Sequence, residues 1–254
     1  MAEKKAFVQS VDRSLQILEL FLDHPSLSLI EISTAMDLAK TTVFGLIATL
    51  EKRGFLEQDE QTGRYQLGYK FLELSSRFVH RADIVNEAVR LLRPIAEIHG
   101  HNAHITSLAK TDVTYIGQVI PENSAISINT VLGSHAPANC TSSGKALLSL
   151  LPEEDLNALY SSNPLEKSTP FSISNPVQLS QHLRTVRVRG YATDRNESIF
   201  GVSSVGVAVC NELGKPVIGI SIAGLSSDFT DELIIEYGKL LKQAASQLQY
   251  YTHL

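Results

Sequence analysis

The sequence predicts an α/β two-domain protein: a winged helix-turn-helix over residues 1–68, a linker helix over 69–82 and an α/β domain over 83–254. Two short amphipathic helices joined by a tight turn occupy residues 28–53, and a polar hairpin containing Gly63 follows them. The rest of the chain mixes strand-like and helix-like segments, as α/β domains do. A length of 254 residues suffices for two modest domains.

Composition and charge narrow the class of protein. Hydrophobic residues make up 43% and charged residues 19% of the chain, which is ordinary for a globular protein. No apolar run reaches membrane-spanning length and no signal peptide opens the chain, so we expect a cytoplasmic protein without a membrane partner. Cys140 and Cys210 form no CxxC pair, so they predict buried thiols rather than a disulfide framework or a zinc site.

The first helix is predicted to start at Ser10, with Ser10 and Asp12 suited to its cap and first turn, and to stop at Pro25. Its apolar stripe is Val11, Leu15, Leu18 and Leu22, widened by Ile17 and Phe21. Ser28 and Glu31 then have the spacing of a capping box, which opens the next helix. That helix is predicted to bury Ile32, Ala35 and Met36.

The second helix of the pair follows a turn at residues 37–39 and is predicted to end at Gly54, a residue typical of the position past a helix terminus. Its core face is Val43, Leu46, Ile47 and Leu50. Its other face carries no acidic residue and consists of Lys40, Thr41, Phe44, Gly45 and Ala48. Nothing on that face repels phosphate.

A helix-turn-helix places the start of its second helix against base edges in the major groove. We therefore expect Lys40 to reach a phosphate or a guanine. Thr41 and Thr42 can bond phosphate or base, and Phe44 can contact a thymine methyl group. The alternative is an ordinary helical hairpin of a protein core, because paired amphipathic helices are common.

Net charge argues for local rather than broad contact with DNA. The whole chain carries −5, and residues 1–68 hold seven basic and ten acidic side chains. A wide basic footprint is therefore absent, and non-specific affinity for DNA should be modest.

Residues 55–67 form two apolar-polar alternations around a turn that contains Gly63, which predicts a β-hairpin. A hairpin after a helix-turn-helix is the wing of a winged helix. Arg64, at the turn, is the wing residue best placed to contact the DNA backbone. The alternative is a solvated hairpin with a chance arginine, which the neighbouring Asp59 and Glu60 favour.

The rest of the chain shows a change from helices to mixed α/β patterns at about Asn102. Helices are predicted over residues 69–81, from Asp83 onward, and over 144–151, 153–160, 177–189 and 231–249. Strands are predicted over residues 105–108, 113–120, 126–132, 205–210 and 217–223, and a loop over 161–176.

Four stretches resemble the IclR-type (isocitrate lyase regulator) family of bacterial transcription factors. Residues 10–19 are similar to the opening helix of that family, and residues 38–50 to its recognition helix. Residues 132–148 resemble its effector-domain signature, and residues 190–201 its second signature. The resemblance covers nearly the whole chain. It implies a winged helix-turn-helix, a linker helix, a GAF-like effector domain, a homodimer or homotetramer, and an effector that is a small organic acid.

This chain also departs from the family pattern. Gly45 stands where the family often has an arginine, which removes a strong contact to DNA and weakens the helix. Asn196-Glu197 replaces two consecutive acids, Ser204 stands at a cysteine position, and Ala223 stands at a serine position. The DNA target and the effector are therefore expected to differ from those of other members.

The segment from Cys140 to Leu148 runs from a loop into a helix and carries the chemistry of an anion site. The backbone N–H groups of residues 142–145 are predicted to be the unpaired donors of the first turn, where the helix dipole favours negative charge. The hydroxyls of Thr141, Ser142 and Ser143 add donors, and Gly144 lets a ligand approach closely. The alternative is a plain serine-capped helix.

The resemblance assigns three more effector contacts: Asp194, which can accept from a ligand hydroxyl or orient a water, and Ser204 and Ser221, which can donate. Ile199, Phe200 and Val202 can supply an apolar wall. Serines on strands often bond only the neighbouring backbone, which is the alternative here.

Two other chemistries have weaker support. Ser142 and Lys145 form the S-x-x-K of serine hydrolases, but the companion motifs and a nucleophile elbow are absent. His99, His101 and His104 lie close together in sequence without a cysteine or acid to complete a metal site, so we expect a solvated cluster. A winged helix that binds protein instead of DNA is a third alternative.

The sequence thus predicts a ligand-responsive regulator that is not an enzyme and needs no metal or cofactor. Its expected partners are double-stranded operator DNA, a small carboxylate and further copies of itself.

Overall fold

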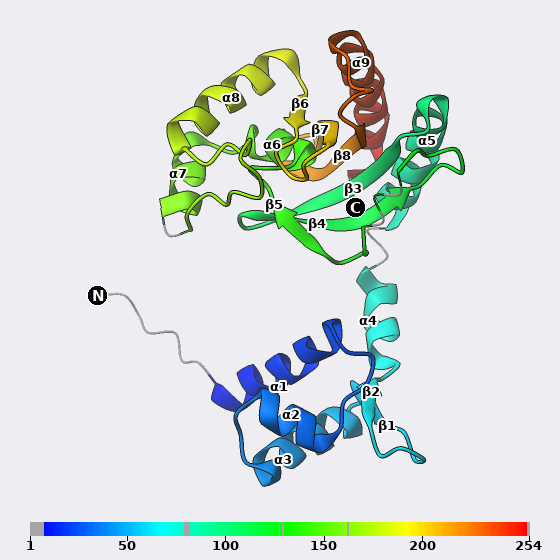
Figure 1. The fold of residues 1–254 in the computed structure, drawn as a ribbon, viewed down its shortest axis with the longest axis vertical. Coiled ribbons are helices and arrows are strands. Elements are labelled where there is room, and N and C mark those ends of the chain that lie inside the picture. Colours follow the sequence, from blue (N-terminus) through cyan, green and yellow to red (C-terminus); the bar gives the residue numbers. More distant parts are fainter. Residues whose placement is uncertain (1–7, 79–81, 127, 129, 162, 253–254) are drawn as a thin grey trace. The chain divides into compact units, whose positions relative to one another are not determined.

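The computed structural model describes residues 8–78, 82–126, 128, 130–161 and 163–252. The chain divides into two compact units, Met1–His80 and Arg81–Leu254, each with its own core (Figure 1). Among the described residues, no helix combines the length and the apolar character needed to cross a membrane.

The N-terminal unit is a winged helix-turn-helix, as predicted. Its elements are α1 (Gln9–Glu19), the 3-10 turn η1 (Leu20–Leu22), α2 (Leu29–Ala35), α3 (Lys40–Lys52), β1 (Leu56–Gln58), β2 (Tyr65–Leu67) and α4 (Lys70–Phe78). Buried apolar residues from α1, α2, α3 and the hairpin form one core, which includes Ile17, Ile32, Ile47 and Leu56. An isolated bridge between Leu27 and Tyr65 joins the hairpin to the segment before α2.

The capping box at the start of α2 is present. The Glu31 N–H donates to Ser28 Oγ at 3.3 Å, and the Ser28 N–H donates to Glu31 Oε2 at 2.7 Å. Two local predictions were wrong. Val8, not Ser10, is the N-cap of α1, and no side chain caps it, because the helix begins one residue earlier. Ala35, which was predicted to be buried, is exposed, and Ile32 is the fully buried residue of α2.

The core face of α3 is as predicted: Val43, Ile47 and Leu50 are buried and Leu46 packs against them. The helix is followed by Gly54 at φ +77°, the left-handed conformation that favours glycine past a helix end. Strands β1 and β2 then pair antiparallel, with Leu56 opposite Leu67.

The C-terminal unit is built on a six-stranded antiparallel sheet in the order β5-β4-β3-β8-β7-β6. Its strands are β3 (Asn102–Ala109), β4 (Asp112–Val119), β5 (His135–Pro137), β6 (Ala192–Arg195), β7 (Val202–Cys210) and β8 (Pro216–Leu225). Its helices are α5 (Ala82–His99), α6 (Ser142–Leu148), α7 (Glu153–Ser161), α8 (Pro176–Arg189), α9 (Asp231–Leu248) and the 3-10 turn η3 (Gln249–Thr252).

Helices cover both faces of this sheet. Helices α5 and α9 pack on one face, where Ile105, Val205 and Ile220 are in their core (Figure 1). Helix α6 lies against the other face and shares a second core with α7 and α8.

Small side chains on β7 and β8 allow α6 to lie directly on the sheet. A Cβ at Gly206 would come within 2.5 Å of the Ser143 backbone nitrogen, and one at Gly219 within 3.0 Å of the Ser143 Cβ. The bulky residues Val205 and Ile220 alternate with these glycines and point to the opposite face, because side chains along a strand alternate. The start of α6 is therefore held against the middle of the sheet.

Several predicted elements of this unit differ in the structure. The described residues of 126–132 are not in a strand, and residues 127 and 129 of this stretch lie outside the described part of the chain. Helix α6 covers Ser142–Leu148 instead of 144–151. Strands β5 and β6 were not predicted, because they have only three and four residues and show little alternation. Cys140 is buried as expected, whereas Cys210 is only partly buried.

Candidate DNA-binding surface and effector pocket

The start of α3 presents the side chains that were predicted to contact DNA. Lys40, Thr41, Thr42 and Phe44 are exposed, and Phe44, at 56%, is unusually exposed for an aromatic side chain. Ala39 is the N-cap and no side chain caps the helix. The first turn therefore combines a positive helix end, hydroxyls and one lysine, a suitable arrangement for a phosphate and neighbouring base edges.

Arg64 has an intramolecular role that the sequence did not indicate. Its guanidinium forms an ion pair with Glu31 at 2.8 Å and donates to the Ser26 Oγ at 3.1 Å and the Ser26 carbonyl at 3.0 Å. Arg64 thereby ties the wing to the start of α2, and its side chain keeps 37% of its surface exposed.

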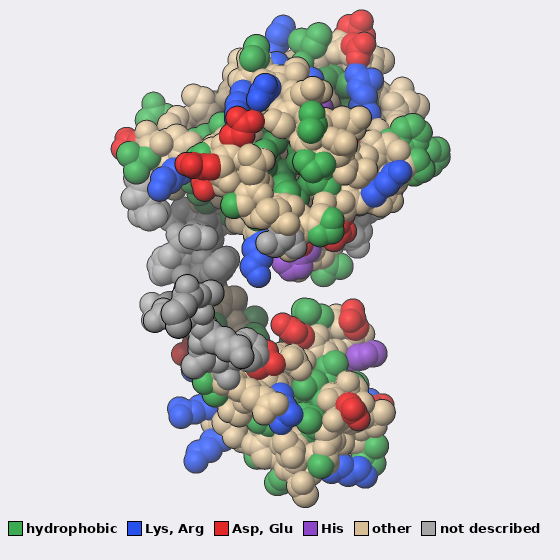
Figure 2. All heavy atoms as spheres, turned by 90° about the vertical axis from the view of Figure 1, so that its left-hand side faces the viewer, with side chains coloured by type: hydrophobic (Ala, Val, Ile, Leu, Met, Phe, Trp, Pro, Cys, Tyr) green, Lys and Arg blue, Asp and Glu red, His purple; other side chains and the backbone are tan. Residues whose placement is uncertain are grey.

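No continuous basic patch is visible on the face of the molecule drawn in Figure 2. Acidic, basic and apolar side chains are interspersed there. This agrees with the excess of acidic residues in positions 1–68.

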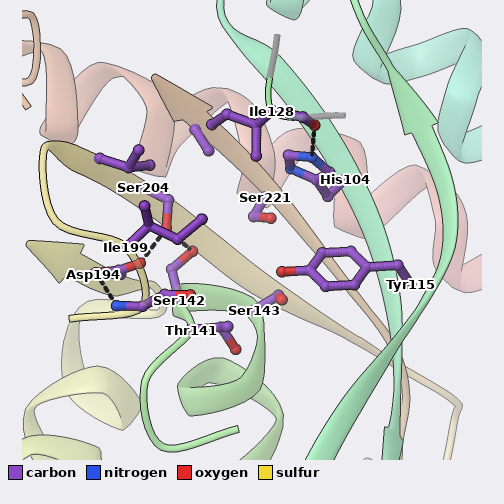
Figure 3. Close-up of a pocket in the computed structure, with 13 residues that line it drawn as sticks. His104, Tyr115, Ile128, Thr141, Ser142, Ser143, Asp194, Ile199, Ser204 and Ser221 are labelled. Atoms are coloured by element: carbon purple, nitrogen blue, oxygen red, sulfur yellow. Dashed lines mark hydrogen bonds between the residues drawn. The ribbon is translucent and has the colours of Figure 1, made fainter. Parts of the chain in front are cut away.

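A pocket lies between the start of α6 and the sheet of the C-terminal unit. The empty space between its lining residues amounts to about 380 Å³, its open mouth included. Its lining residues come from α6 and its N-cap, five strands and two loops: His104, Tyr115, Ile128, Thr141, Ser142, Ser143, Asp194, Ser198, Ile199, Val202, Ser204, Ser221 and Ala223. Figure 3 shows the hydroxyls of α6 on one side and Tyr115 and His104 on the other.

Six of the seven predicted effector residues line this pocket: Thr141, Ser142, Ser143, Asp194, Ser204 and Ser221. Gly144 does not line it. A Cβ at Gly144 would lie 2.4 Å from the Ala138 carbonyl oxygen, so this glycine permits contact with the protein's own backbone and not with a ligand.

The predicted set of unpaired donors at the start of α6 was wrong in two positions. The Gly144 N–H donates to Thr141 Oγ1 at 3.1 Å, and the Lys145 N–H donates to the Thr141 carbonyl at 2.9 Å. Thr141 is the N-cap and uses its side chain within the helix. The lining groups that can donate from α6 are therefore Ser142 and Ser143.

Asp194 is the acidic residue of the pocket and is only 3% exposed. Its Oδ1 accepts from the Glu197 N–H at 2.7 Å and the Ser198 N–H at 3.4 Å. Its Oδ2 lies 3.4 Å from Ser204 Oγ, which donates to Ser142 Oγ at 2.7 Å. Burial raises the pKa of the Asp194 carboxyl from 3.8 to about 7, against the opposing effect of the Lys145 charge.

Lys145 and Glu197 form an ion pair beside this cluster. Lys145 is fully buried, and its ammonium bonds Glu197 Oε1. Glu197 Oε2 is buried and has no hydrogen-bond partner among the described residues, and burial raises the pKa of this carboxyl. The lysine of the S-x-x-K segment is thus occupied by an ion pair and does not line the pocket.

His104 and Tyr115 line the pocket but were not selected from the sequence. Their rings meet edge to face at 5.5 Å. Burial lowers the pKa of His104 to about 4 and raises that of Tyr115 to about 12, so both are neutral near pH 7. Both residues lie on strands that the sequence predicted in part, but Tyr115 is brought opposite Thr106 by a register shift between Ile105 and Thr106 that the sequence does not reveal.

The apolar wall is formed by fewer residues than predicted. Ile199 and Val202 line the pocket, together with Ile128 and Ala223, whereas Phe200 does not. The ring of Phe200 stacks on Phe171 at 6.1 Å.

The three histidines near residue 100 do not converge on one site. His101 is buried and lies 2.7 Å from the Tyr237 hydroxyl and 3.4 Å from Asp228 Oδ2, while His104 belongs to the pocket. Within the described part of the chain, no group of three or more His, Cys, Asp or Glu side chains is arranged to hold a metal ion.

A winged helix-turn-helix joined to a separate unit with a polar pocket defines a ligand-responsive transcriptional regulator. The family model for the IclR helix-turn-helix domain matches residues 10–60, and the model for the bacterial transcriptional regulator IclR C-terminal domain matches residues 76–250. The chain belongs to the IclR family of bacterial transcriptional regulators.

Individual relatives agree over nearly full length. The chain is 31% identical to the transcriptional regulator XynR of Escherichia coli K12 over 242 residues, covering 95% of this chain and 96% of XynR. It is 28% identical to the transcriptional repressor AllR of the same strain, covering 98% of this chain and 91% of AllR. The crystal structure of the Thermotoga maritima IclR matches with a TM-score of 0.75 and 31% identity, and the match covers 95% of this chain and 97% of the Thermotoga chain. These relatives are regulators, so the hydrolase alternative is set aside.

Proposed function

We propose that this regulator binds operator DNA through the start of α3 and binds a small carboxylate in the pocket at the start of α6, in the cytoplasm, where bacterial DNA lies. One observation carries the proposal: Thr141, Ser142, Ser143, Asp194, Ser204 and Ser221 are dispersed in sequence and line one pocket. The hydroxyls and the positive end of α6 favour a carboxylate, and the aliphatic side chains on the pocket wall suit its apolar part.

Lys40, Thr41, Thr42 and Phe44 are the proposed DNA contacts. Arg64 supports this interface by holding the wing against the start of α2, and its exposed part faces solvent. Because Lys40 is the one basic side chain among the exposed residues of the first turn of α3, its contact should account for about one phosphate.

The Lys40→Ala substitution tests this interface. It should weaken operator binding and lower the slope of log affinity against log salt by about one unit, because one phosphate contact is lost. Fluorescence anisotropy over a salt series measures both quantities. An unchanged affinity and slope would exclude Lys40 from the interface.

The carboxylate is tested by thermal denaturation with acetate, lactate and benzoate against their methyl esters. An acid that binds should raise the melting temperature logarithmically with its concentration, because binding to the native state alone stabilises by mass action. The matching ester should be much weaker, since it lacks the charge. Ser221→Ala should reduce the gain while operator binding by the ligand-free protein remains. Equal effects of acid and ester would contradict the anion site.

Oligomerisation is proposed from exposed apolar side chains on the N-terminal unit. Val11 and Leu15 on α1 and Leu72 and Leu74 on α4 are all at least half exposed. A second copy that covers them would bring two recognition helices to successive major grooves, about 34 Å apart.

A further inference from the structure

The charges around the pocket do not balance if a carboxylate enters with Asp194 ionised. The described lining contains one carboxyl, that of Asp194, and no lysine or arginine. The buried cation beside it, Lys145, is paired with Glu197. A bound carboxylate would therefore place a second negative charge next to Asp194, without a free cation among the lining residues.

Two carboxylates that share a buried site cannot both ionise without a large energetic cost, so one of them keeps a proton. Asp194 is built to be that group. Its Oδ1 is occupied by the backbone donors of Glu197 and Ser198, which leaves Oδ2 to carry the proton. Ser204 donates its hydrogen to Ser142, so its oxygen can accept from a protonated Oδ2.

Three other titratable groups of this unit are unsuited to hold this proton: Tyr115, His104 and His182. From β4, Tyr115 is already neutral, because burial raises its pKa to about 12. From β3, His104 has a pKa lowered to about 4 by burial. From α8, His182 has a pKa lowered to about 4 by burial and by the charges of Lys145 and Arg189. Glu197 Oε1 is paired with the Lys145 ammonium, yet burial raises the pKa of this carboxyl, so Glu197 is a competing group that the Asp194→Asn variant leaves in place.

We propose that this pocket binds its carboxylate together with one proton from solvent, which Asp194 holds for as long as the ligand stays bound. The charge balance is simple: the ionised Asp194, one proton and the ligand anion give a neutral Asp194 beside a bound anion. This inference rests on the proposed carboxylate site and adds a regulatory property to it. The regulator would respond to the acid and to pH together, and acidification would increase its occupancy.

The expected pH profile follows from linkage. In the free protein Asp194 titrates at about 7, so below about pH 6 the proton is already present and affinity should be constant. Above pH 7 the proton must be taken up, and affinity should fall about tenfold per pH unit until the bound form itself titrates.

The test is calorimetric titration of the full-length protein with benzoate and lactate between about pH 6 and about pH 8.5, both probes being ionised throughout. Titrations at each pH in two buffers whose ionisation enthalpies differ, MES and Bis-Tris near pH 6 and HEPES and Tris near pH 8, count the protons taken up. We expect close to one proton per ligand at pH 8 and little uptake at pH 6. Binding without uptake, and with one affinity across the range, would overturn this inference.

Two variants locate the proton. Asp194→Asn imitates the protonated side chain, so probe binding by this variant should be independent of pH and take up no proton. His104→Gln removes the histidine of the pocket and should keep the pH dependence of the natural protein. If His104→Gln abolished the pH dependence, or if Asp194→Asn retained it, Asp194 would not be the proton carrier. The uptake measurement on the natural protein stands even if a variant fails to fold.

The outcomes separate this inference from the proposed function. If neither the two probes nor acetate binds at any pH, the carboxylate site fails and this inference fails with it. If a probe binds without proton uptake, the carboxylate site stands and only the role of Asp194 as a proton carrier is refuted.

Discussion

Asp194 shows how enclosure changes a single side chain. The backbone donors of Glu197 and Ser198 stabilise its ionised form, yet burial outweighs them and raises its pKa to about 7. An exposed aspartate with the same two hydrogen bonds would have a lowered pKa, because hydrogen bonds to the charged form favour it. The protonation of Asp194 is therefore set by the surroundings that β6, β7 and α6 provide.

This shift should appear in the stability of the ligand-free protein. Native Asp194 has a higher pKa than the ordinary 3.8, so the folded state binds the proton more tightly than the unfolded state. Stability contributed by this group is present at low pH and is lost as pH rises from about 4 to about 7, then stays constant. Asp194→Asn should thus stabilise at pH 8 by at most about 4 kcal/mol, since one pKa unit corresponds to about 1.4 kcal/mol.

Chemical denaturation at pH 4.5 and pH 8 measures this difference. The difference should shrink to about 1 kcal/mol at the lower pH, because native Asp194 is neutral there, as asparagine is, and only the unfolded aspartate is ionised. Asp23→Asn, at an exposed aspartate of the N-terminal unit, is the control and should show no such pH-dependent gain. A gain from Asp194→Asn that is equal at both pH values would argue against ionisation as the cause.

At the scale of elements, α3 combines a well-packed inner face with a sparse outer face. Val43, Ile47 and Leu50 are buried, while the exposed basic residues of α3 are Lys40 in its first turn and Lys52 in its last. Gly45 lies in the middle of that outer face, and nothing lies within 4 Å of where its Cβ would be. The glycine is therefore not required by packing.

Gly45 substitutions should separate helix stability from DNA contact. Gly45→Ala should stabilise the protein by about 1 kcal/mol, the usual difference between these residues in a helix, and leave the salt dependence of operator binding unchanged. Gly45→Arg should also stabilise the helix and, in addition, steepen the slope of log affinity against log salt by about one unit. If both variants bound DNA alike, position 45 would not face the phosphates.

At the scale of the whole molecule, the two units offer different types of binding surface. The N-terminal unit exposes apolar side chains on α1 and α4, and the C-terminal unit holds a pocket in which Ser142, Ser204 and Asp194 are linked by hydrogen bonds. Control of transcription requires two arrangements of the DNA-binding units in the oligomer. The ligand must bind these two arrangements with different affinity, since only differential affinity shifts an equilibrium.

Charge introduced on the apolar surface should disrupt assembly. Leu15→Glu on α1 and Leu72→Glu on α4 should each weaken self-association and operator binding, because an ionised side chain cannot be buried unpaired in an interface. Leu213→Glu, at an exposed leucine of the turn between β7 and β8, is the matched control. Sedimentation velocity at micromolar concentration measures the change. A natural protein that sediments as a monomer and binds its operator as one copy would contradict the proposal.

The sequence by itself determined the elements whose signals are local. The capping box of Ser28 and Glu31, the left-handed Gly54 and the core face of α3 depend on residues within one or two turns of each other, so spacing alone predicts them. Short strands such as β5 and β6 escaped detection, because three or four residues carry too little periodicity.

Only the tertiary structure decided which distant residues meet. Asp194 lies opposite Ser204 because β6 and β7 pair in that register, and a shift of one residue would turn Ser204 to the other face. Arg64 finds Ser26 and Glu31 through the fold of the wing. Gly144 faces Ala138 because α6 is held against the sheet. The resemblance to a family assigned Asp194, Ser204 and Ser221 to the effector site, but their hydrogen bonds, their burial and the pKa of Asp194 depend on distances that no local pattern encodes.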